Sequence, residues 1–170
     1  MAGKTIGIGM NYGYAGNYAR TPDDIVASRK LAGEANVPFG AAVAIKADNT
    51  FVPVDSNFKA EDFGGIALRV VKQATSYYDQ NHAAYVPGEM LNALQRGAAT
   101  VICNVGTPTA GGAVYVRITE NAGVANGVVG GFEAAADGAN TVLVPNLKWT
   151  NGYIDANRVA EVTILTRVNP

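Results

Sequence analysis

The chain has 170 residues, of which 48% are hydrophobic, 16% are charged and 20 are glycine. This length suits one domain with one core, and so much glycine argues against a coiled coil or a long helical bundle. The formal net charge of −1 provides no field to attract phosphates, which excludes nucleic acid as an expected partner. No apolar run is long enough to span a bilayer and no signal peptide is visible, so we expect a soluble, unexported protein without a membrane partner.

The first 20 residues are rich in glycine, show no helical periodicity, and carry Tyr12, Tyr14 and Tyr18. Such a segment has too little hydrophobic surface to fold alone, whereas tyrosine gains most when it is buried against another surface. We therefore expect residues 1–20 to become ordered only on a partner, with the three tyrosines as contacts. We interpret residues 1–36 as an N-terminal arm and residues 37–170 as a β-rich domain.

A helix-start signal follows the tyrosines. Thr21 can cap a helix, Pro22 suits its first position, and Asp23 and Asp24 suit its first turn. The apolar residues at positions 25, 26 and 31 nevertheless form a poor helical face. The sequence therefore leaves a short helix and an extended segment equally open for residues 22–33.

From residue 37 onward, short apolar segments are separated by Gly, Pro, Asn and Asp, a pattern typical of an all-β domain. The expected strands are residues 41–46, 50–54, 66–72, 98–105, 112–119, 141–144 and 159–168. The strand at residues 50–54 contains Pro53, which marks it as an edge strand because proline has no backbone N–H to donate to a neighbouring strand.

One segment shows an especially clear strand pattern, and another carries conflicting signals. Residues 112–119 alternate strictly, with apolar side chains at 114, 116 and 118 on one face and Tyr115, Arg117 and Thr119 on the other. Residues 89–96 consist of good helix formers, but the turn signal before them and the strands around them favour an extended segment. The sequence thus predicts an all-β fold: a compact β-sandwich or barrel-like domain with an extended Gly/Tyr-rich N-terminal arm.

Residues that commonly carry out catalysis or bind metals are scarce. Cys103 is the single cysteine and His82 the single histidine, so an internal disulfide and a cysteine-based zinc site are excluded. Cys103 lies in an apolar segment and should be a buried thiol, whereas His82 lies in a polar loop. The glycines at 7, 9 and 13 miss the spacing of a phosphate-binding loop. We expect no enzyme activity, no catalytic residue, no cofactor and no metal.

The remaining aromatic signals are Tyr77, Tyr78 and Trp149. Aromatic pairs in β proteins line interfaces more often than they line carbohydrate or peptide grooves, so we assign Tyr77 and Tyr78 to an interface. The alternative is a carbohydrate-binding β-sandwich module or a tail-associated adhesin that uses all three rings as stacking platforms. A small hydrolase would instead require converging carboxylates, which the sequence does not place together.

The order of turn and strand signals resembles that of the bacteriophage capsid cement, or head decoration, proteins. No single segment is distinctive, and the resemblance lies in their succession over residues 37–165. The segments that carry it are 36–40 (NVPFG), 64–67 (GGIA), 85–88 (YVPG), 95–97 (QRG), 112–116 (GAVYV), 137–140 (DGAN), 145–149 (PNLKW) and 160–162 (AEV).

The resemblance implies a β-rich structural virion protein that is made in the host cytoplasm, binds the outer surface of the phage capsid and stabilises the head lattice. Its implied partners are the major capsid protein and other copies of itself, with a trimer favoured over a dimer. A capsid-binding protein needs an arm and exposed aromatic side chains more than a catalytic pocket. We therefore expect Tyr12, Tyr14, Tyr18, Tyr77 and Tyr78 to bind the capsid or a neighbouring subunit.

Overall fold

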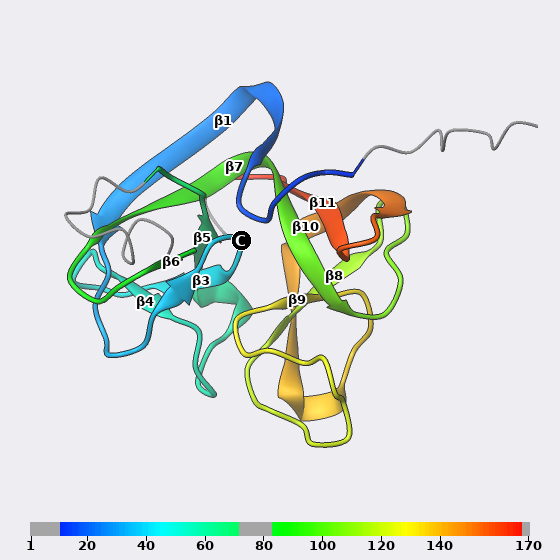
Figure 1. Cartoon of the computed structure of the whole chain (residues 1–170). Coiled ribbons are helices and arrows are strands. Elements are labelled where there is room, and N and C mark those ends of the chain that lie inside the picture. Colours follow the sequence, from blue (N-terminus) through cyan, green and yellow to red (C-terminus); the bar gives the residue numbers. More distant parts are fainter. Residues whose placement is uncertain (1–10, 72–82, 168–170) are drawn as a thin grey trace, which may run out of the picture.

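The computed structural model describes residues 11–71 and 83–167, and within them the chain is built from strands and two single-turn 3-10 helices (Figure 1). The all-β prediction is confirmed. The strands are β1 (Tyr18–Lys30), β2 (Val37–Pro38), β3 (Ala42–Ile45), β4 (Phe51–Pro53), β5 (Phe63–Ala67), β6 (Ala84–Tyr85), β7 (Met90–Val105), β8 (Ala113–Arg117), β9 (Phe132–Glu133), β10 (Thr141–Ile154) and β11 (Val159–Ile164), and the 3-10 helices are η1 (Ala60–Asp62) and η2 (Gly138–Asn140).

The larger sheet closes on itself and forms a barrel. Its strands follow the order β11-β10-β8-β9-β7, and β11 also pairs with β7, which completes the ring. The pairing of β7 with β9 is parallel, and the other pairings in the ring are antiparallel. From the first half of β7 the sheet continues through β5 and β3 to β4. Of the two architectures left open by the sequence, the barrel-like one is therefore correct.

The long strand β7 joins the two halves of the molecule (Figure 1). It has 16 residues and pairs with β1, β5, β9 and β11. Residues 89–96, whose composition favours a helix, lie almost entirely in this strand, and the prediction of an extended segment is confirmed. Leu91 and Leu94 point to opposite faces of the strand, and both are fully buried, Leu91 in one hydrophobic cluster and Leu94 in the other. Because β7 is buried on both faces and paired along both edges, these tertiary contacts override the intrinsic helix propensity of residues 89–96.

Most expected strands are found, with altered boundaries. The segment predicted at 66–72 begins earlier, at Phe63, and ends at Ala67. The segment predicted at 141–144 extends to Ile154 because β10 continues through a register shift on β8 between Leu143 and Lys148. The proline of β4 lies on the last strand of the sheet, as an edge position requires.

Residues 18–30 are extended, which decides between the two alternatives left open for residues 22–33. They form β1, a strand of 13 residues that pairs antiparallel with β7. The helix-start acids do not cap a helix, and Asp23 instead accepts a hydrogen bond from Arg96 of β7 at 3.1 Å. The division of the chain at residue 36 stays a prediction, and the structure adds that β1, within the arm, belongs to the same sheet as the strands after it.

The described end of the arm, residues 11–20, packs on the domain. The Gly16 amide donates a hydrogen bond to the Thr100 carbonyl at 2.7 Å, and the Thr100 amide donates to the Asn17 carbonyl at 2.9 Å. A Cβ at Gly16, where φ is +86°, would lie 2.9 Å from the amide nitrogens of Arg69 and Gly40, so only glycine permits this close approach. The expectation that residues 1–20 order only on a partner is therefore wrong for residues 11–20.

Two hydrophobic clusters fill the molecule. The larger one lies in the barrel and includes Trp149, Phe132 and Cys103, and the smaller one lies under β1 and includes Leu31 and Tyr85. Cys103 is completely buried, as expected, and this burial raises the pKa of its thiol. Trp149 is also buried, so the idea that its ring serves as an exposed stacking platform is wrong.

Candidate interaction surface

The structure places three of the five tyrosines predicted to bind a partner. Tyr14 is 66% exposed and Tyr18 is 51% exposed, so both rings are free to contact another surface. Tyr12 is half-buried, and its hydroxyl and the Asn151 side chain exchange hydrogen bonds of 3.1 and 2.8 Å. The arm thus brings Tyr14 and Tyr18 to the surface, whereas Tyr12 mainly attaches the arm. Tyr77, Tyr78 and His82 lie outside the described residues.

An arginine lies between two aromatic rings beside the arm. The guanidinium carbon of Arg69 is 4.5 Å from the centre of the Tyr14 ring and 5.7 Å from the centre of the Phe39 ring. A cation over an aromatic face is attracted by the ring quadrupole, and the stack limits the motion of both exposed side chains. Tyrosine and arginine are, with tryptophan, the residues that most often contribute strongly to protein interfaces. This stack is therefore the first part of the candidate surface.

An apolar groove adjoins the stack. Its volume is about 230 Å³, and none of its lining residues is charged. Ile102 and Val128, on its walls, are 44% and 53% exposed, so the groove is open to solvent. We call it the Phe39 groove, and it is lined by Ala15, Pro38, Phe39, Gly40, Ala41, Ile102, Asn104, Val128, Val129 and Gly131. Together with the stack it forms a continuous, mostly apolar surface of the kind found at protein interfaces.

A second cavity, of about 430 Å³, is more polar. Its lining includes Arg29, Glu61, Gln95 and Arg167. In residues 11–71 and 83–167 there is no group of three or more His, Cys, Asp or Glu side chains able to hold a metal ion. Within the same ranges, no helix has the length and apolarity of a membrane span.

A buried ion pair positions the long loop that carries Val128. Arg117, at the end of β8, and Glu133, in β9, are both completely buried, and two guanidinium nitrogens donate to the two carboxylate oxygens. The third guanidinium nitrogen donates to Asp137 at 2.8 Å. Asp137 also accepts hydrogen bonds from the Asn121 side chain, so both ends of the loop are tied to Arg117 and its partners. This network fixes one wall of the Phe39 groove.

The network should make the stability of the protein depend on acid pH. Hydrogen bonds from Asn121, and then from Arg117, hold the pKa of Asp137 below its ordinary value of about 4. Ionised Asp137 therefore stabilises the fold above that ordinary value, and this contribution is lost as the pH falls through the lower folded-state value. We expect the melting temperature of the native protein to exceed that of Asp137→Asn most above pH 5, with the difference shrinking toward pH 3. A difference that stays constant over this range would contradict the assignment.

Sequence reasoning did not identify the rest of this surface. Arg69, Phe39 and Ile102 each lie in or beside an expected strand, where a side chain can point inward or outward with no local sign of which. Val128 carried a usable signal, because it belongs to a pair of valines within a glycine-rich segment that none of the expected strands covers. Apolar residues in a loop need either a core or a partner, and Val128 is exposed.

The comparisons with known proteins point to one family. The family model described as "Structural cement protein (E217 gp24/Pam3 gp6)", a phage cement family, matches residues 2–165. A chain from the structure titled "The capsid of Myoviridae Phage XM1" shares the fold, with a TM-score of 0.69, 15% sequence identity and 99% of each chain covered. No curated protein matches the sequence. Because the family match extends over nearly the whole chain, the protein belongs to the family of phage structural cement proteins.

Proposed function

We propose that this protein binds the outer surface of a phage capsid and stabilises the assembled head. The family match over residues 2–165 is the observation that carries this proposal. The similarity of the whole fold to a chain in a phage capsid structure supports it. The outer position is supported by the net charge of −1, since a protein facing packaged DNA would be expected to offer a basic surface.

We further propose that the capsid contact is centred on Tyr14, Tyr18 and Arg69. Both tyrosines are mostly exposed, and Arg69 is held against Tyr14, so a partner that covers them would bury large rings at little cost in side-chain ordering. A head presents many identical sites, and modest contacts repeated over a lattice give firm attachment. Copies of the protein are proposed to associate on the head, as a trimer in preference to a dimer, because closed symmetry covers strand edges, and the sheet ends at β4.

The test uses heads that lack this protein, mixed with the purified full chain. We expect Tyr14→Ala and Tyr18→Ala each to weaken binding by about 5- to 30-fold, the range that corresponds to roughly 1–2 kcal/mol per interface tyrosine. Sedimentation of heads with bound protein, followed by quantification, gives the affinity. Leu143→Ala is the matched control, because Leu143 of β10 is an apolar side chain that is 44% exposed and lies outside the proposed contact.

Two outcomes would count against the proposal. If the native chain does not bind heads, the cement function itself is wrong for this protein. If it binds but both tyrosine variants bind as tightly as Leu143→Ala, the function stands and the contact surface lies elsewhere. All variants change exposed side chains, so their melting temperatures should match that of the native protein and exclude misfolding as a cause.

A further inference from the structure

The more polar cavity, of about 430 Å³, lies where the barrel meets the rest of the sheet. Its walls come from β1, β3, η1, β5, β7 and the residues that follow β11. Of these, β11 is a strand of the barrel, whereas β3 and β5 belong to the extension of the sheet. The volume falls within the range of about 300–1,000 Å³ that is usual for ligand pockets. We call it the Arg29 cavity.

The two arginines of this cavity have no acidic partner in residues 11–71 and 83–167. Arg29, in β1, is half-buried, and its guanidinium carbon lies 5.3 Å from the centre of the Phe51 ring. Arg167 follows β11 and is exposed. In these ranges neither guanidinium forms an ion pair or donates a hydrogen bond. Both therefore keep their five N–H donors for a ligand.

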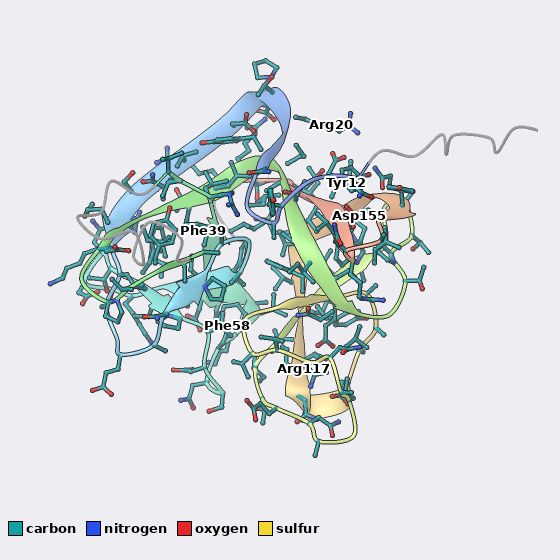
Figure 2. All side chains as sticks on the ribbon, viewed as in Figure 1. Tyr12, Arg20, Phe39, Phe58, Arg117 and Asp155 are labelled. Carbon is teal, nitrogen blue, oxygen red and sulfur yellow. The ribbon has the colours of Figure 1, made fainter. Side chains whose placement is uncertain are left out.

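The acid in the lining does not neutralise these arginines. The carboxylate of Glu61, in η1, lies 3.6 Å from the Lys59 ammonium, and both side chains are mostly exposed. Phe58, labelled in Figure 2, is buried in the larger hydrophobic cluster and holds this segment in place. The cavity thus keeps an excess of positive charge on a chain whose formal net charge is −1. Such a local field attracts an anionic ligand.

A buried amide adds a donor to the wall of the cavity. Gln95, in β7, is 9% exposed, and its Nε2 donates to the Gly64 carbonyl at 3.3 Å. Its side chain makes no other hydrogen bond within the part of the chain that the structure describes. The second N–H of the amide is therefore available to a ligand. Because buried polar groups are normally paired, this spare donor also indicates a ligand that accepts hydrogen bonds.

We propose that the Arg29 cavity binds an acidic segment of a capsid subunit, with a carboxylate held by Arg29 and Arg167. The inference rests on the proposed cement function and deepens it, because it adds a second contact with the head and names the chemistry of the partner. The planar guanidinium fork matches the two oxygens of a carboxylate. Ile45 and Phe63 line the same cavity and suit the methylene stem of a glutamate side chain.

The size of the cavity favours a peptide segment over a free inorganic anion. A volume of about 430 Å³ is far larger than a phosphate ion fills, and part of the wall is apolar. A glutamate or aspartate that enters with its neighbouring residues occupies this space and covers the apolar wall as well as the arginines. Since Arg29 and Arg167 belong to different parts of the sheet, such a segment bridges β1 and the end of the barrel.

The first experiment compares variants of the full chain on heads that lack this protein. Arg29→Gln should weaken binding about tenfold, as expected when a hydrogen bond to a charged group is lost. Arg167→Gln, at an exposed position, should weaken it about twofold to fivefold. Lys30→Gln is the matched control, because it removes one charge from the neighbouring residue of β1, whose side chain points to the other face.

Salt separates recognition of charge from structural damage. The difference in affinity between the native chain and Arg29→Gln should shrink as the salt concentration rises from about 0.05 to about 0.5 M, because ions screen the contact. The melting temperatures of Arg29→Gln, Arg167→Gln and Lys30→Gln should stay close to the native value, since these side chains make no hydrogen bond within the described ranges.

The second experiment probes the cavity without heads. A blocked tetraglutamate peptide is added to the ¹⁵N-labelled full chain, and the side-chain N–H signals of Arg29 and Gln95 are followed by NMR. We expect saturable shifts of both signals, and no shift with blocked tetraglutamine. In Arg29→Gln/Arg167→Gln the Gln95 signal should no longer respond. Inorganic phosphate tests the other class of anion and should act only at higher concentration than tetraglutamate.

Each remaining result counts against a defined part of the argument. If the native chain does not bind heads, the cement function is wrong, and the peptide titration alone then decides the chemistry of the cavity. If the native chain binds and Arg29→Gln binds as tightly as Lys30→Gln, the cavity does not contact the head. The acidic peptide is wrong as the occupant if tetraglutamate leaves the Arg29 and Gln95 signals unchanged, or if phosphate shifts them at lower concentration.

Discussion

Replacing Arg117 with methionine is expected to lower the free energy of unfolding by about 3–5 kcal/mol. The substitution leaves the Glu133 carboxylate completely buried without its cation, and it also removes the donor that Asp137 accepts from at 2.8 Å. An uncompensated charge in a low-dielectric interior is far costlier than the loss of the pair's own attraction. The loop of residues 118–131 should also become less well fixed, because Arg117 directly precedes it and holds Glu133, which follows it.

Chemical denaturation measures this change, and Arg96→Met provides the control. Arg96 also lies on a strand and pairs with an acid, Asp23, but both partners are well exposed, so its loss should cost no more than about 1 kcal/mol. The double variant Arg117→Met/Glu133→Leu should regain much of the lost stability, since no buried charge is then left alone. Equal effects of Arg117→Met and Arg96→Met would contradict the proposed importance of the buried pair.

Replacing Gly65, in β5, with alanine is also expected to lower the free energy of unfolding strongly. Its φ is +139°, and a Cβ at this position would overlap the carbonyl oxygen of Leu94 and lie 3.1 Å from the Cβ of Ala93, both in β7. Gly65→Ala should therefore add overpacking of about 1–3 kcal/mol to a backbone strain of about 1–3 kcal/mol. The obstacle is backbone on a central strand, so it cannot be relieved by a rotamer change.

A second glycine separates the two contributions. Gly111 also has a positive φ, of +71°, but a Cβ there has nothing within 4 Å. Gly111→Ala should thus show the backbone strain alone, and the melting temperature of Gly65→Ala should fall distinctly further. If the two variants melt at the same temperature, β5 and β7 are not packed as closely as described.

Local patterns predicted the strands well and the contacts between them poorly. The alternation in residues 112–119 correctly placed Val114 and Val116 in the core. The same alternation assigned Arg117 to a polar face, whereas it is completely buried. Its carboxylate partners lie 16 and 20 residues further along the chain, and nothing local to β8 indicates that they fold over it.

The contacts of the arm were also not predicted from the sequence. Its glycine and tyrosine content predicted a segment that becomes ordered only on a partner, yet residues 11–20 dock on the domain of the same chain. The docking depends on backbone hydrogen bonds to Thr100 and on the pairing of Arg20 with the nearly buried Glu161. Main-chain contacts leave no mark in the sequence except a required glycine, here Gly16. Tyr14 and Tyr18 are exposed, and their role as contacts to a partner stays a prediction.

The continuity of β7 bears on how a cement protein withstands force. A filled head presses outward, and the expansion of its shell pulls neighbouring capsid subunits apart along the surface. A clamp built from two separately closed halves would have a weak joint, at which tension could peel one half from the other. Here the barrel and the sheet extension share one uninterrupted 16-residue strand with partners along its edges. On the proposed function, tension applied along β7 would shear many hydrogen bonds at once instead of opening them one after another.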